Sequence, residues 1–234
     1  DLNPTAVWDS TYNAVWHLGE NGTTFNDSTS SGNTGTGGSA PLTSPLNTAG
    51  KTGFGESFTS ITDSIGFPPS LTLNNPGPVT YSGWFYNGAT GGNLLFSKKY
   101  ILLKRNGPNV LFEILQNGSD LYVEENDGFL ATNTWVYLTI SWDGISADTT
   151  GIDIYNNGDL YSGAAYEDAG SGTKLPDNSG DFYLGAYDTV DGQSLVFKVD
   201  EFRISNIVRS ADWIKAQYLS QNDQFITFGS EEKL

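Results

Sequence analysis

The chain has 234 residues, a formal net charge of −16 and no cysteine, and its pI is near 4.1. The lack of cysteine excludes disulfides and thiolate metal sites. The acidic balance argues against nucleic acid and anionic membrane surfaces as partners, because both would repel the chain. No stretch is long and apolar enough to predict membrane insertion. Six tryptophans, twelve tyrosines and thirteen phenylalanines, in a background rich in glycine, asparagine, serine and threonine, favour an all-β protein with an aromatic core.

The first fifth of the chain reads as a connector, a strand and a long loop. We expect residues 1–12 to connect to a missing upstream part of a longer parent chain, with neighbouring domains. Asn13 to Leu18 alternates well enough to be a strand. Glu20 to Lys51 is polar and predicts a loop, and loops of this length inside a compact domain are usually functional or mobile. No composition shift marks a boundary, so residues 1–234 are interpreted as a single domain.

Short β segments follow one another from Phe54 onward, separated by Asn-Gly and Asp-Gly turns. Many short strands at this spacing predict a sandwich or barrel. One helix is expected near the C-terminus over Ala211–Leu219, with Ser210 as its N-cap, followed by a last strand over Gln224–Phe228. The predicted strands are Gly55–Thr59, Leu71–Leu73, Val79–Tyr86, Asn93–Lys98, Asn109–Leu115, Asp120–Glu125, Thr134–Trp142, Gly151–Tyr155, Leu160–Ala164, Asp181–Gly185 and Leu195–Ile204.

Two distant acidic segments point to one shared cation. Gly192 to Ser205 alternates like a buried strand yet carries Asp200 and Glu201 in its middle, although strand interiors disfavour acidic residues. Glu20 to Thr36 is an acidic, glycine-rich loop without lysine or arginine. Calcium takes hard oxygen ligands of the kind that these segments offer. Zinc is disfavoured because His17 is the one histidine, and it reads as a packing or surface residue.

Several motifs in this order resemble the laminin-G-like branch of the concanavalin A-like lectin/glucanase superfamily, as found in bacterial and archaeal surface proteins. The resemblance implies an all-β, two-sheet antiparallel jelly-roll sandwich, one structural calcium ion, and a role in carbohydrate binding or adhesion outside the cell. The matching pieces are AVWHLGE (Ala14–Glu20), DSTSSGNTGT (Asp27–Thr36), GKTGFGESF (Gly50–Phe58), VTYSGWFY (Val79–Tyr86), LLFSKK (Leu94–Lys99), NTWVYLTISWDG (Asn133–Gly144), GIDIYNNGDL (Gly151–Leu160), FYLGAY (Phe182–Tyr187) and VDEFRISNIVRSADWI (Val199–Ile214).

By the same resemblance, the calcium ligands are expected to be Glu20, Asp27, Asn33 and Asp200, with Asn33 acting through its backbone carbonyl. Saturating calcium is then expected to stabilise the fold. The alternative is that Asp27 merely forms a turn, while Asp200 pairs with Arg203 or with a backbone N–H.

The sequence argues against an enzyme. Glucanases of this superfamily set their carboxyl pair on one strand face as Glu-x-Asp-x-Glu, and no such motif occurs here. Asp200 and Glu201 are adjacent, so a regular strand would point them to opposite faces. The nucleophile elbow, the phosphate-binding loop and the dinucleotide fingerprint are also missing from the sequence. A glycoside hydrolase is kept as the weaker alternative.

Aromatic residues supply the candidates for a ligand surface, because rings pack against the apolar faces of sugars. Trp84 and Tyr86 share one face of a predicted strand, and Tyr100 follows two lysines, which favours an exposed position. The alternative reading of Trp84 is a core residue. The expected partner is a glycan or a surface protein. A structural display or assembly module of a surface filament, cell envelope or virion, without a sugar ligand, is the other open interpretation.

Overall fold

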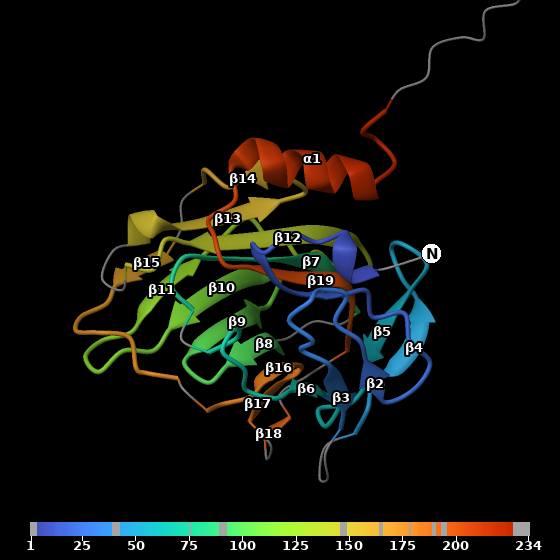
Figure 1. The fold of residues 1–234 in the computed structure, drawn as a ribbon. Coiled ribbons are helices and arrows are strands. Elements are labelled where there is room, and N and C mark those ends of the chain that lie inside the picture. Colours follow the sequence, from blue (N-terminus) through green and yellow to red (C-terminus); the bar gives the residue numbers. More distant parts are fainter. Residues whose placement is uncertain are drawn as a thin grey trace, which may run out of the picture.

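The computed structural model describes residues 4–38, 43–74, 76–88, 93–145, 149–163, 166–177, 179–188, 191–192 and 196–226. Two antiparallel β-sheets stack as two layers, and helix α1 (Ala211–Gln221) lies across the outer face of the first sheet (Figure 1). This confirms the predicted all-β sandwich with one helix near the C-terminus. No helix among the described residues is long and apolar enough to cross a membrane.

The first sheet has the strand order β14-β13-β12-β7-β19-β5-β4, and β1 also pairs with β19. Strands far apart in sequence are therefore neighbours, as in β7 beside β19. The bounds are β1 Tyr12–Trp16, β4 Leu46–Ala49, β5 Phe54–Phe58, β7 Val79–Asn87, β12 Trp135–Trp142, β13 Ile152–Asn156, β14 Asp159–Leu160 and β19 Phe197–Ser205.

The second sheet has the order β15-β11-β10-β9-β8-β16-β6-β3-β2, and β17 and β18 form a small hairpin that pairs with neither sheet. Short 3₁₀ turns occur at Pro4–Ala6 and Thr149–Gly151. The bounds are β2 Thr24–Phe25, β3 Gly35–Gly37, β6 Ile65–Phe67, β8 Asn93–Lys98, β9 Ile101–Asn106, β10 Asn109–Ile114, β11 Leu121–Glu124, β15 Tyr166–Ala169, β16 Phe182–Leu184, β17 Ala186–Asp188 and β18 Asp191–Gly192.

Aromatic rings fill the space between the sheets. The Trp16 ring centroid lies 3.9 Å from that of Phe67, and the Phe182 centroid lies 5.7 Å from that of Phe202. All four side chains are fully or almost fully buried. Close ring pairs of this kind add to the apolar area that they remove from water, so these rings join strands of both layers into one core.

Helix α1 begins where the sequence predicts. The Ser210 hydroxyl accepts a hydrogen bond from the Trp213 amide at 3.3 Å, which caps the first turn. The helix is tied to the sheet by side-chain amides as well as by packing. Gln221 Oε1 accepts from the Trp84 indole N–H at 2.6 Å, and Gln217 Oε1 accepts from the Tyr137 hydroxyl at 2.7 Å.

Some predicted elements were wrong. Leu71–Leu73 forms a turn, with Leu71 98% exposed, and the strand of this region is β6. The predicted loop Glu20–Lys51 contains the short strands β2, β3 and β4, which pair at the sheet edges although their sequence is polar. Strand β9 was missed because its charged second half does not alternate. Of the expected last strand, residues 224–226 form none, and 227–228 lie outside the described residues.

Candidate ligand-binding site

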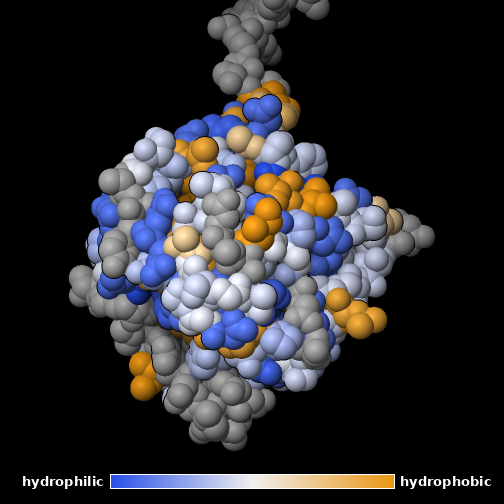
Figure 2. Space-filling view, turned by 90° about the vertical axis from the view of Figure 1, so that its left-hand side faces the viewer, coloured by the Kyte–Doolittle hydropathy of each residue, from blue (hydrophilic) through white to orange (hydrophobic). Residues whose placement is uncertain are grey.

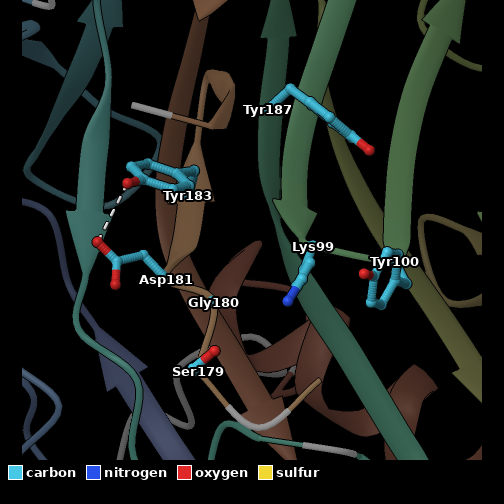
Figure 3. A pocket seen from close by; sticks show the side chains of 7 residues that line it. All are labelled: Lys99, Tyr100, Ser179, Gly180, Asp181, Tyr183 and Tyr187. Atoms are coloured by element: carbon cyan, nitrogen blue, oxygen red, sulfur yellow. Dashed lines mark hydrogen bonds between the residues drawn. The ribbon is translucent and has the colours of Figure 1, made fainter. Parts of the chain in front are cut away.

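A hollow of about 480 Å³ opens on the second sheet, beside the β8–β9 turn and the segment that leads into β16 (Figure 3). We call it the tyrosine hollow. Figure 3 shows Asp181 and Tyr183 on one side, Tyr100 on the other, and Lys99 between them. Its lining residues are Lys99, Tyr100, Ser179, Gly180, Asp181, Tyr183 and Tyr187.

The right-hand side of the hollow is a two-residue turn. Lys98 pairs with Ile101 across the β8–β9 hairpin, which leaves Lys99 and Tyr100 as the turn itself. Lys99 adopts a φ of 51°, in the left-handed region that favours glycine. Its ammonium nitrogen lies 5.1 Å from the centre of the Tyr100 ring. A lysine is thus held in a strained turn conformation beside an aromatic ring, as is common where a protein contacts a ligand.

The lower side is anchored by a buried ion pair. The Lys98 ammonium is almost fully buried, 3.1 Å from Asp177 Oδ2, and it also donates to Asn74 Oδ1 at 3.0 Å and to the Gly180 carbonyl. Burial lowers the pKa of Lys98, and Asp177 opposes that shift. The Gly180 amide donates back to Asp177 Oδ1 at 3.0 Å. These bonds hold the backbone around Ser179 against the end of β8.

The remaining side comes from β16 and β17. The Tyr183 hydroxyl donates to Asp181 Oδ2 at 3.1 Å. The Tyr183 ring passes over Gly66, where an added Cβ would come within 3.0 Å of it. Ser97 donates to the Ala186 carbonyl at 2.7 Å, which holds β17 over β8. The hollow therefore combines tyrosine rings and hydroxyls with a carboxylate acceptor and an ammonium donor.

Of the three predicted ligand residues, the structure places Tyr100 in this hollow. Trp84 is buried under α1, with Lys51 Nζ 4.8 Å from its ring centre, so it presents no free face. Tyr86 is half-buried on the outer face of the first sheet, where its ring lies 5.5 Å from that of Trp135. The three residues thus do not form one site.

Sequence reasoning missed Asp181, Tyr183 and Tyr187. Their signal was present in the FYLGAY segment. Phe182 and Leu184 are core residues, so alternation along β16 points Tyr183 to the outer face. The sequence does not show that β17 lies against β8. This packing brings Tyr187 next to the β8–β9 turn, some 90 positions earlier in the chain.

The predicted metal ligands Asp27 and Asn33 are fully engaged by the protein. Asp27 Oδ1 accepts from the Val15 and Thr29 amides at 3.0 and 2.9 Å. Its Oδ2 accepts from the Thr29 hydroxyl and the Asn33 amide at 2.9 and 2.8 Å. The Asn33 carbonyl accepts from the Trp16 indole at 2.7 Å. A carboxylate with four donors has little capacity left for a cation, so these two residues as placed fit a turn and not a metal site.

Glu20 lies in a different environment. Its Oε1 accepts from the Asn26 amide at 2.8 Å, while its Oε2 is buried without a partner. Glu56 on β5 is nearby and buried, and the hydrogen bond that it accepts from Asn47 Nδ2 is long, at 3.4 Å. Burial raises the pKa of Glu56 to about 8, and the charge of Glu20 adds to the shift. Glu56 was not among the predicted ligands, although its oxygens suit a cation better than those of Asp27.

Asp200 lies apart from this pair. Val199, the residue before it, is the strand partner of Glu56, so alternation points Asp200 to the other face of the sheet. Asp200 Oδ2 accepts from the Lys51 and Thr52 amides at 2.7 and 2.8 Å, and its Oδ1 is buried without a partner. Burial raises the pKa of Asp200 to about 6.

In the described ranges, no three histidine, aspartate or glutamate side chains meet in a way that could hold a metal ion. The oxygens of Glu20 and Asp200 that lack partners are the parts of the predicted set that still fit one. Calcium binding stays a prediction. One ion shared by Glu20 and Asp200 would have to be bound by two carboxylates that lie in different environments.

Glu201, and not Asp200, pairs with Arg203. The Glu201 carboxylate lies 2.6 Å from an Arg203 guanidinium nitrogen and 2.7 Å from His17 Nδ1. Glu201 has a φ of 53° at a bulge in the pairing of β19 with β7. Its hydrogen bond raises the pKa of His17, which is half-exposed as expected for a surface residue. The two adjacent acids thus have separate partners, and the register of β19 with β7 shifts between Asp200 and Arg203.

A family model of the concanavalin A-like lectin/glucanases superfamily matches residues 58–215, about two thirds of the chain. Comparison with curated protein sequences gives no significant match.

Several solved structures have a similar fold. The binding domain of Paraclostridial mosquitocidal protein 1 superposes with a TM-score of 0.69 at 13% identity, over 90% of this chain and 52% of that one. The botulinum neurotoxin serotype D binding domain gives 0.65 at 15% identity, over 91% and 53%. The serotype G binding domain gives 0.66 at 13% identity, over 90% and 51%. The chain thus spans about half the length of these binding domains, and the likeness is one of fold.

Proposed function

The chain belongs to the concanavalin A-like lectin/glucanases superfamily, and from this premise we propose that it is a non-catalytic module that binds carbohydrate through the tyrosine hollow. The observation that carries the proposal is the meeting of Tyr100, Tyr183 and Tyr187 with Asp181 and Lys99 around one opening. The similar solved structures are described as binding domains, which agrees with a recognition role.

The chemistry of the hollow suits a sugar. The rings of the half-buried Tyr100 and Tyr187 offer flat apolar area at little cost in rotamer entropy, and the C–H faces of a pyranose can pack on them. Tyr183 is buried and forms part of the wall. Asp181 accepts hydrogen bonds from hydroxyl groups, while Lys99 donates to them. The ion pair of Lys98 and Asp177 holds the loop before binding, so little ordering remains to be done when a ligand arrives.

Several contacts support a role without catalysis. Glu113 on β10 and Glu124 on β11 lie on two adjacent strands of the second sheet. Glu113 pairs with Lys104, and Glu124 accepts from Asn106 at 3.0 Å. Such pairing suits structural carboxylates, because each of the two already has a partner within the protein. We place the module outside the cell, on the same family premise, with a glycan or a glycosylated surface protein as its partner.

The test is a glycan array probed with the full chain and with the double variant Tyr100→Ala/Tyr187→Ala. We expect a bound glycan whose affinity falls at least about tenfold in the variant, about 1.4 kcal/mol. Tyr122→Ala, on the outer face of the same sheet, is the matched control and should bind normally. Unchanged binding by the double variant would refute the hollow as the site. An array without any bound glycan, together with self-association of the chain, would favour the display interpretation.

A further inference from the structure

A second opening lies on the other side of the molecule, between α1 and the N-terminal segment. We call it the helix cleft; its volume is about 370 Å³. Trp8 and Tyr12 form one wall, with ring centroids 5.0 Å apart. Trp213 and Phe225 stand at the ends of the helix wall and are 45% and 60% exposed. Figure 2 shows hydrophobic atoms at the top of the molecule, where α1 lies.

The helix wall is one stripe of α1. Trp213, Ala216, Gln217, Ser220 and Gln221 recur at the three- and four-residue spacing that places side chains on one face of a helix. The two small residues are in the middle of the stripe, between the Trp213 ring and the Phe225 ring. A flat molecule therefore has room over Ala216 and Ser220, with aromatic rings at both ends.

Two polar groups in this cleft lack hydrogen-bond acceptors. Arg203 is more than nine-tenths buried; one guanidinium nitrogen pairs with Glu201, but its Nε has no partner. Gln221 accepts from Trp84 through Oε1, while its Nε2 is buried and also without a partner. Both nitrogens lie just below the cleft surface, and the Arg203 guanidinium is stacked 4.9 Å over the Trp8 ring. An unmade bond at a buried donor is costly, so a ligand whose acceptors meet these nitrogens after a small side-chain shift would recover that free energy.

We propose that the helix cleft is a second carbohydrate site, which takes a pyranose ring between Trp213 and Trp8 with its hydroxyl oxygens toward Arg203 and Gln221. A pyranose has both features that the cleft demands, an apolar face and acceptors around its rim. A purely apolar ligand would leave both donors unsatisfied.

The six tryptophans allow a test that separates this site from the tyrosine hollow, which contains none. Cellohexaose, laminarihexaose and the best glycan from an array are titrated into ¹⁵N-labelled full chain, and the indole N–H signals are followed. We expect the signals of Trp8 and Trp213 to shift, and also that of Trp84, because its indole is bonded to Gln221. The buried Trp16 and Trp142 are internal controls and should not move.

Two variants complete the test. Trp213→Ala removes a ring, and Ser220→Phe fills the cleft without removing any of its contacts. Each should weaken binding at least about tenfold. Phe54→Ala, which removes an exposed ring on β5, is the matched control.

The outcomes are distinct. The second site is overturned if binding is lost in Tyr100→Ala/Tyr187→Ala but is unchanged in Trp213→Ala and Ser220→Phe, and if the indole N–H signals do not shift. The tyrosine hollow would then remain as the binding site. Binding lost only in the cleft variants supports the helix cleft and refutes the hollow. If none of the sugars binds the full chain, both proposals fail.

Discussion

Two regions of this sandwich bury charge in opposite ways. Behind the tyrosine hollow, the Lys98 ammonium has Asp177, Asn74 and the Gly180 carbonyl around it. Under the Glu20 loop, Glu56 is as deeply buried but has one long bond from Asn47 and a second carboxylate for a neighbour. The first arrangement fixes a loop. The second stores a cost that a proton, or a cation, would relieve.

The largest effect is expected from breaking the compensated region. Lys98→Met leaves Asp177 buried without its cation and frees the Gly180 carbonyl, so the free energy of unfolding should fall by about 3–5 kcal/mol. Glycan affinity at the tyrosine hollow should fall as well, because Ser179 and Gly180 lose their anchor. Urea denaturation and glycan titration measure the two effects.

Lys104→Met is the control for that experiment. Lys104 also pairs with a carboxylate, Glu113, but its side chain is 40% exposed. Exposed pairs of this kind contribute about 0–1 kcal/mol. If the two lysine variants lose the same stability, the distinction between a buried anchor and a surface pair is wrong.

The uncompensated region should show itself through pH. The pKa of Glu56 is raised by burial to about 8, above its ordinary value of 4.5. Between these values the folded chain keeps a proton on Glu56 that the unfolded chain has lost, so the contribution of Glu56 to stability is largest below pH 4.5 and is lost as pH rises toward 8. The slope reaches about 1.4 kcal/mol for each pH unit from this one group. Glu56→Gln should flatten the profile and stabilise the chain at pH 8, as followed by urea denaturation from pH 5 to 8.

Calcium sharpens the same comparison. If Glu20 and the carboxyls near it take a cation, calcium at a hundredfold excess over its dissociation constant should add about 2.7 kcal/mol of stability. The gain should shrink in Glu20→Gln and persist in Asp27→Asn, whose carboxylate is already occupied by four donors. A melting temperature that neither calcium nor chelator changes would count against any calcium site.

The contrast also explains what the sequence could and could not predict. Alternation and Asn-Gly turns located β7, β10 and β12, because each strand carries its own pattern of core residues. Ser210 located the helix start for the same local reason. By contrast, β4 pairs with β5 through backbone hydrogen bonds, and its polar sequence does not predict a strand. Local patterns sufficed wherever the cause of the structure is local.

The candidate sites depend on long-range contacts, and here prediction was partial. Tyr100 was predicted because its two lysine neighbours suggest exposure. Asp181 and Tyr187 reach it only through the pairing of β16 with β8 and the turn of β17. Asp27 looked like a metal ligand because a sequence shows which oxygens exist but not which of them already have donors. The amides of Val15 and Asn33 decide that question, and they are 18 positions apart in the chain.

The smallest predicted effect concerns Lys99, where the fold favours one residue and the site another. At a φ of 51° a non-glycine residue costs about 1–2 kcal/mol, partly offset by the extra freedom that glycine has when unfolded. Lys99→Gly should therefore raise the free energy of unfolding by about 0.5–1 kcal/mol while weakening glycan binding, because the ammonium beside Tyr100 is lost. Lys99→Ala removes the ammonium but keeps the strain, so it should weaken binding without the gain in stability. Equal stability of the glycine and alanine variants would mean that the turn is not strained. The role of Lys99 would then be ligand binding alone.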